Sequence, residues 1–163
     1  MKDAKPLNIS LVKEFYAHYT RPGQRTVYVR GDAVPFTAED INQFYGLDVE
    51  DQHSVFVASM LGQDQDFLLQ ELCIEGTTWD EANTTVDRTS LKLEGKLWMH
   101  FIKSNLMPTI HTATVNLGRL QLLHSIVRNG KINVGKIIIE EAYATLKRKQ
   151  NPLVFPYLIT ALC

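Results

Sequence analysis

The sequence predicts an α+β protein that is predominantly α-helical, folded as a single compact domain over residues 1–163 with one small β-hairpin. Three observations support this fold class. The length of 163 residues is that of one domain. The composition, 45% hydrophobic and 21% charged, is typical of a globular protein. Apolar residues recur at three- and four-residue spacing through most of the chain, which favours helices.

The first predicted helix covers residues 9–20. Its apolar face consists of Leu11, Val12, Phe15, Tyr16 and Tyr19. Two β-rich runs, 26–30 and 33–36, then flank Gly31-Asp32 and predict a hairpin with a two-residue turn. Pro35 lacks a backbone N–H, so we expect the second strand to be an edge.

The next helix is expected to begin at Thr37, because an acid at Asp40 completes a variant capping box. We expect Ile41, Phe44 and Tyr45 to face inward and Gly46 to end the helix. The acidic and then apolar stretch 48–63 predicts a loop plus a short helix.

Four further helical segments follow, separated by a polar, turn-rich stretch at 76–90 in which Trp79 is the expected anchor. A helix through 67–73 is capped by Asp64 or Asp66, and three more cover 93–106, 117–129 and 134–149. In the helix 93–106, the residues expected on the inward arc are Leu97, Trp98, Phe101 and Ile102. The chain closes on the apolar segment 155–163, which suggests that it was cut from a longer protein.

Catalytic motifs are not found in the sequence. It contains no phosphate-binding glycine loop and no zinc-binding helix. Cys73 lies on an apolar helix face, where a buried, inert, reduced thiol is expected, and His111 is expected to fix a turn by bonding backbone carbonyls. We therefore expect a protein that is not an enzyme and has no catalytic residues, no metal ligands and no cofactor.

Charge is divided unequally along the chain. Residues 1–87, the acidic half, hold six Lys and Arg against fifteen Asp and Glu. Residues 88–163, the basic half, hold eleven against three. Three explanations stay open: a polyanion-binding surface, attraction between the halves of one domain, or contacts between copies of the chain. No run of about 18 apolar residues occurs, so no membrane partner is expected.

The basic half supplies the candidate binding residues. Residues advance by about 100° each along a helix, so Lys96, His100 and Lys103 are expected to form one exposed stripe on the helix 93–106. The candidates for contacting nucleic acid or a protein partner are Lys96, His100, Lys103, Arg128, Lys131, Lys147, Arg148 and Lys149. Arg119 differs, since it falls between apolar positions of its helix. We expect it to pair inside the domain, most simply with a carboxylate of the acidic half.

Several sequence blocks resemble, in order and spacing, a plant family, the "putative plant transposon protein domain" of plant retroelements. The blocks that carry the resemblance include 11–17, Val29-Arg30-Gly31, 41–47, 106–112, 132–138 and 155–163. The resemblance implies a retroelement-derived domain inside a plant cell, in nucleus or cytoplasm, but it implies no activity.

Two function classes follow for such a domain. The first is a non-catalytic interaction module that binds nucleic acid or a protein partner through the basic half. The alternative is a Gag-like structural domain that self-associates.

Overall fold

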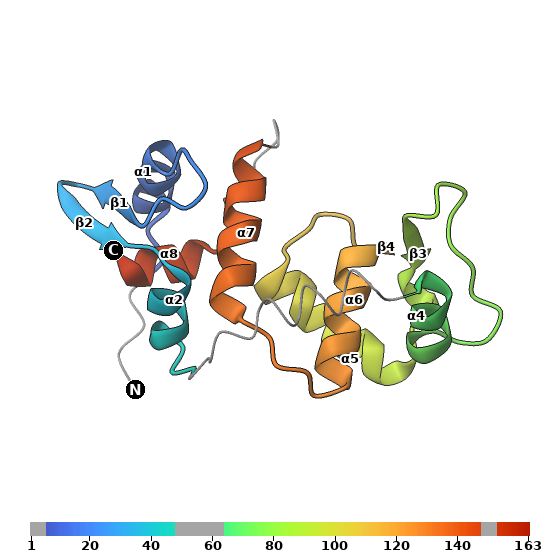
Figure 1. Cartoon of the computed structure of the whole chain (residues 1–163). Coiled ribbons are helices and arrows are strands. Elements are labelled where there is room, and N and C mark those ends of the chain that lie inside the picture. Colours follow the sequence, from blue (N-terminus) through green and yellow to red (C-terminus); the bar gives the residue numbers. More distant parts are fainter. Residues whose placement is uncertain (1–5, 48–63, 148–152) are drawn as a thin grey trace. The chain divides into compact units, whose positions relative to one another are not determined.

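The computed structural model describes residues 6–47, 64–147 and 153–163, which are mostly helical with two small antiparallel sheets (Figure 1). The predicted fold class is confirmed. The chain gathers into two compact units. The first unit consists of Met1–Asp48 and Val134–Cys163, and the second of Val49–Asn133. That the two units fold together as a single domain stays a prediction, and the expected loop and helix at 48–63 lie outside the described residues.

The first unit contains the hairpin and helices that the sequence predicts, together with α8, which was not predicted. Its elements are α1 (Ile9–His18), β1 (Thr26–Val29), β2 (Asp32–Pro35), α2 (Ala38–Phe44), α7 (Val134–Lys147) and α8 (Pro156–Leu162). The predicted capping box of α2 is present. The hydroxyl of Thr37 accepts from the Asp40 N–H at 3.2 Å, and the Asp40 carboxylate accepts from the Thr37 N–H at 2.9 Å.

The hairpin turn lies one residue earlier than predicted. Val29 pairs with Asp32, so the two turn residues are Arg30 and Gly31. Both have positive φ angles, 54° and 87°, as a type I′ turn requires. Glycine adopts this conformation without steric cost, whereas Arg30 is held there while its N–H donates to the Glu14 carboxylate at 2.6 Å.

The core of the first unit is centred on an aromatic cluster. The Phe15 and Phe36 rings lie 4.9 Å apart between centroids, and Tyr19 lies 5.3 Å from Phe36. Ile41 of α2 is buried as predicted, but Phe44 and Tyr45 are 46% and 48% exposed. The inward prediction for these two is wrong because α2 directs its Ile41 and Asn42 face toward the core.

The second unit is built from α4, α5 and α6 with short connecting elements. Its elements are α4 (Gln65–Leu72), β3 (Thr85–Asp87), η1 (Arg88–Ser90), α5 (Leu93–Phe101), η2 (Ile102–Leu106), β4 (Thr114–Asn116) and α6 (Leu117–Val127). Asp64 caps α4, since its carboxylate accepts from the Asp66 N–H at 3.1 Å. Fully buried core side chains of this unit include Leu68, Leu91, Met99, Ile102, Leu120 and Leu123.

A second antiparallel sheet, β3 with β4, was not predicted. Val86 pairs with Val115, and both side chains are buried. Each strand has only three residues, in segments otherwise rich in Thr, Asp and Asn. Such strands are too short to show an alternating pattern, which is why the stretch 76–90 was predicted as turns only.

The predicted helix 93–106 forms in two parts. α5 ends at Phe101, and the last turn, η2, is π-helical. A π-helical turn contains more residues than an α-helical turn, so it shifts which side chains face inward. Of the candidate binding residues, Lys103 lies in this turn.

Candidate functional site

The eight candidate binding residues are spread along the chain. Lys96, His100 and Lys103 lie on α5 and η2, Arg128 and Lys131 follow α6, and Lys147 ends α7. Arg148 and Lys149 lie outside the described residues. Five candidates therefore belong to the second unit and Lys147 belongs to the first.

Lys103 does not lie on an exposed stripe, so its predicted placement is wrong. The residue is only 9% exposed. Its ammonium donates to three backbone carbonyls, those of His111 at 3.2 Å, Thr112 at 3.1 Å and Thr114 at 2.7 Å. The side chain therefore fastens the loop before β4 to η2, and its donors are directed at this loop.

The surroundings of Lys103 disfavour its charge. Burial lowers the pKa of its amine, and the positive charges of Arg119 and Arg88 lower it further. The hydrogen bonds from the ammonium to three carbonyl groups nevertheless offset the cost of burying this charge.

Arg119 contacts groups inside the unit, as predicted, whereas its pairing with a carboxylate of the acidic half stays a prediction. It is 8% exposed, and its guanidinium donates to the Met107 carbonyl at 3.1 and 2.9 Å and to the Pro108 carbonyl at 3.4 Å. Lys103 and Arg119 thus hold the two ends of one loop. His111, expected to fix this turn, is itself exposed.

Lys96 and His100 are the candidates that share one side of α5. They are four residues apart, which places them on neighbouring turns of the helix. His100 is exposed and Lys96 is half-buried. Together they form the basic flank of this helix.

The remaining described candidates lie at helix ends or, for Lys131, in the connection between α6 and α7. Arg128 forms an ion pair with Glu71, and Lys131 is exposed. The Lys147 ammonium lies 4.8 Å from the centroid of the Tyr143 ring, a cation–π contact. Local packing on their own units therefore accounts for the positions of Arg128 and Lys147.

The most unusual surface of the second unit is apolar. Leu93, Leu97, Trp98 and Phe101 are 77%, 69%, 40% and 44% exposed, and we name these four residues the α5 apolar surface. The sequence predicted Leu97, Trp98 and Phe101 as inward, and that prediction is wrong. Of the predicted arc, Ile102 is buried.

A second apolar arc on the same helix explains the error. Gly95, Met99, Ile102 and Leu106 recur at spacings of four, three and four, and these are buried. At Gly95 a Cβ atom would meet the Leu123 side chain at 3.4 Å, so α5 packs closely on α6. The glycine is the sequence signal for this choice, because a helix face without a side chain permits the closest approach.

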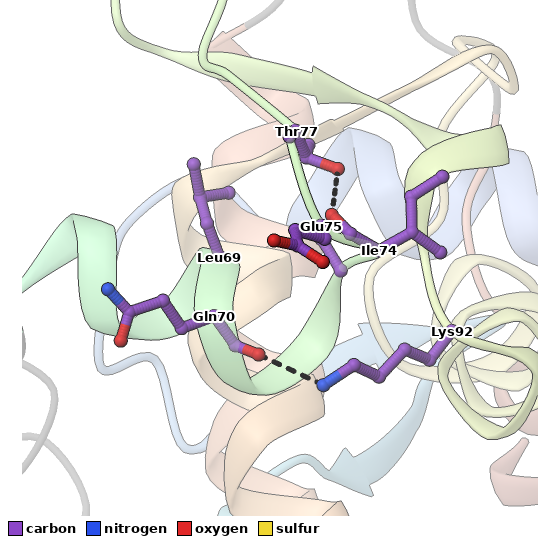
Figure 2. A pocket seen from close by; sticks show the side chains of 8 residues that line it. Leu69, Gln70, Ile74, Glu75, Thr77 and Lys92 are labelled. Atoms are coloured by element: carbon purple, nitrogen blue, oxygen red, sulfur yellow. Dashed lines mark hydrogen bonds between the residues drawn. The ribbon is translucent and has the colours of Figure 1, made fainter.

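One pocket of the second unit has a volume of about 330 Å³ (Figure 2). The residues that line it include Leu69, Cys73, Ile74, Gly76, Thr77 and Lys92. The Lys92 ammonium donates to the Gln70 and Glu71 carbonyls at 2.9 and 2.8 Å, and therefore caps the end of α4. Its charge is directed at the helix end.

Cys73 is a free thiol, as predicted, and Cys163 is a reduced thiol as well. Cys73 is buried, and this burial raises the pKa of its thiol against a smaller opposing effect of the Lys92 charge. A raised pKa leaves little nucleophilic thiolate at neutral pH. Cys73 therefore behaves as a core side chain.

Metal-binding and membrane-spanning features were sought in residues 6–47, 64–147 and 153–163. Within these ranges, no group of three His, Cys, Asp or Glu side chains is placed to hold a metal ion. Nor does any helix within them have the length and apolar character needed to cross a membrane.

Comparison with known proteins identifies a family. No curated protein and no solved structure matches the chain. One family, described as "Putative plant retrotransposon-related domain", matches residues 1–163. This match covers the whole chain and agrees with the resemblance carried by its sequence blocks. The protein therefore belongs to the plant retrotransposon-related domain family.

Proposed function

We propose that this retrotransposon-related domain is a non-catalytic module that binds a protein partner through the α5 apolar surface, in the nucleus or cytoplasm of a plant cell. One observation carries the proposal: four large apolar side chains of a single short helix are 40% to 77% exposed. Contiguous apolar surface of this kind is typical of protein interaction sites.

The composition of this surface also fits a protein partner. Trp98 and Phe101 pack edge to face, with ring centroids 6.0 Å apart. Aromatic side chains dominate the binding energy of protein interfaces because they bury a large area at a small cost in conformational entropy. Lys96 and His100 on the basic flank would lie at the rim, where charges set orientation.

Nucleic acid is a weaker candidate for the basic half. Phosphate binding needs several cations with free donors on one surface. Lys103 donates to three carbonyls inside the second unit, Lys92 donates to the end of α4, and Arg128 pairs with Glu71. Among the described candidates, Lys96 and His100 share one side of α5, and two such side chains would contribute only a weak, salt-sensitive attraction.

Site-specific photo-crosslinking in plant cells tests the proposal. A photoreactive amino acid replaces Leu97, and the control places it at Tyr157, which is equally exposed at 69% but belongs to the first unit. We expect protein adducts from position 97 that are lost when Leu93→Ser is added. Adducts that are absent at 97, or identical at both positions, would overturn the proposal.

A further inference from the structure

The two flanks of the α5 apolar surface carry unlike chemistry. Leu97 lies at the centre of the exposed face, with Leu93 and Phe101 one helical turn before and after it. At about 100° per residue, Glu94 and Trp98 fall on one side of this line. Lys96 and His100 fall on the other. The surface is therefore an apolar line between an acidic, aromatic flank and a basic flank.

We propose that the partner of this surface is a second copy of the same chain, and that the two α5 helices pair in parallel about a twofold axis. The inference rests on the proposed function, and it names the partner. A twofold interface presents the same patch from both chains, so the patch must be complementary to itself.

The charge pattern selects the parallel arrangement. A twofold axis parallel to the helices brings the acidic flank of each copy against the basic flank of the other. Glu94 and Lys96 differ by two residues, about 3 Å along a helix, so they come within pairing reach across the interface. Trp98 then faces Lys96 of the second copy, an arrangement suited to a cation–π contact.

The antiparallel arrangement is disfavoured by the same residues. In that arrangement the twofold axis is perpendicular to the helices, and each flank faces the same flank of the other copy. Lys96 would lie beside Lys96, a like-charge contact that costs energy at an interface. In the parallel pair the like residues that meet are Leu93, Leu97 and Phe101, which stack as three apolar layers.

Measuring the solution mass of the purified chain by sedimentation equilibrium, between about 1 μM and 1 mM, tests the inference in the affinity range of small interfaces. We expect a monomer–dimer equilibrium that Leu97→Ser weakens at least tenfold. The control is Tyr157→Ser, which should leave it unchanged. Both positions are exposed, so circular dichroism should show intact folding in each variant.

A charge swap tests the parallel geometry. Glu94→Lys and Lys96→Glu should each weaken the dimer severalfold, and the double variant, which restores the ion pair but not the contact with Trp98, should recover most of the lost affinity. The inference is overturned if the dimerisation affinity does not recover in the double variant, or if Leu97→Ser leaves this affinity unchanged. A chain that stays monomeric at every concentration also overturns it. In each case the proposed function still stands if position 97 crosslinks to other proteins in the cell.

Discussion

The side-chain oxygen of Asn42 accepts a hydrogen bond from the backbone N–H of Gly135 at 2.8 Å. Asn42 is 5% exposed, and the bond joins α2 to the first turn of α7 within the first unit. A backbone N–H in the first turn of a helix has no partner inside that helix, so Asn42 satisfies a group that would otherwise be buried without a bond. The two helices approach so closely here that a Cβ atom at Gly135 would lie 2.2 Å from the Ala38 carbonyl oxygen.

This close approach predicts that Gly135→Ala destabilises the protein. The Cβ atom would meet backbone rather than a flexible side chain, so α2 and α7 must move apart. We expect a loss of about 1–3 kcal/mol in the free energy of unfolding, measured by urea denaturation. Gly118→Ala is the matched control, because its Cβ would meet only the end of the Met107 side chain, at 3.9 Å. That change should be neutral or stabilising, and an equal loss at both sites would contradict the packing account.

Tyr19 provides a prediction about alkaline pH. Its side chain is buried, and its hydroxyl has no hydrogen-bond partner in the part of the chain that the structure describes. Burial raises the pKa of Tyr19, and the Tyr143 charge adds to this effect. The unfolded chain therefore ionises first as pH rises past about 10, and the stability present at lower pH is lost.

Tyr19→Phe should remove both the buried hydroxyl without a hydrogen bond and the loss of stability at alkaline pH. We expect it to raise the free energy of unfolding by about 1 kcal/mol at neutral pH, and by more above pH 10. Tyr16→Phe is the contrast, because the Tyr16 hydroxyl donates to the Val154 carbonyl at 2.9 Å. Tyr16→Phe should lose about 1 kcal/mol at neutral pH. Urea denaturation at both pH values checks the pair, and a destabilised Tyr19→Phe at neutral pH would refute the account.

The three carbonyl contacts of Lys103 predict a structural effect. Lys103→Met removes three hydrogen bonds to the loop before β4, and we expect a loss of about 1–3 kcal/mol in unfolding free energy. Lys96→Met is the matched control, because the Lys96 ammonium makes no such contact with the residues that the structure describes, and it should change stability by less than about 0.5 kcal/mol. Thermal denaturation of the two variants compares them directly, and equal melting temperatures would show that Lys103 does not hold the loop.

Most helices could be predicted from the sequence because capping residues, turn glycines and apolar spacing each involve only residues close together in the chain. Thr37 and Asp40 form the expected capping box, and Gly46 ends α2 with a φ angle of 67°. Gly31 likewise located the hairpin, although the register was off by one because the turn also places Arg30 at positive φ. Each of these features depends on a few neighbouring residues, which a sequence displays directly.

The surfaces could not be predicted in the same way, because tertiary contacts decide them. The helix 93–106 carries two apolar arcs, and only its packing on α6 through Gly95 selects the buried one. Lys103 lies beside the buried arc, four residues after Met99, in the π-helical turn η2 that no local pattern predicted. Arg119 was placed correctly because its own helix already positioned it among apolar residues.

Unfolding of the two units should be cooperative if they form the single domain that the sequence predicts. Trp79 and Trp98 both belong to the second unit and are the two tryptophans of the chain. Tryptophan fluorescence therefore reports the second unit, whereas far-ultraviolet circular dichroism reports both. We expect the two urea transitions to coincide. Midpoints that differ would show that the units unfold separately.

The orientation of α5 underlies the proposed function, and one pair of substitutions tests it most directly. Leu97 is 69% exposed, whereas Met99, two residues later, is fully buried. A charge is tolerated on an exposed helix position but is costly in a core.

The decisive measurement is the free energy of unfolding in urea for Leu97→Glu and Met99→Glu, at a protein concentration low enough to keep the chain monomeric. We expect Leu97→Glu to change it by less than about 0.5 kcal/mol, and Met99→Glu to lower it by more than about 3 kcal/mol or prevent folding. A stable Met99→Glu together with an unfolded Leu97→Glu would contradict the account, because it would place the apolar surface of α5 inside the protein.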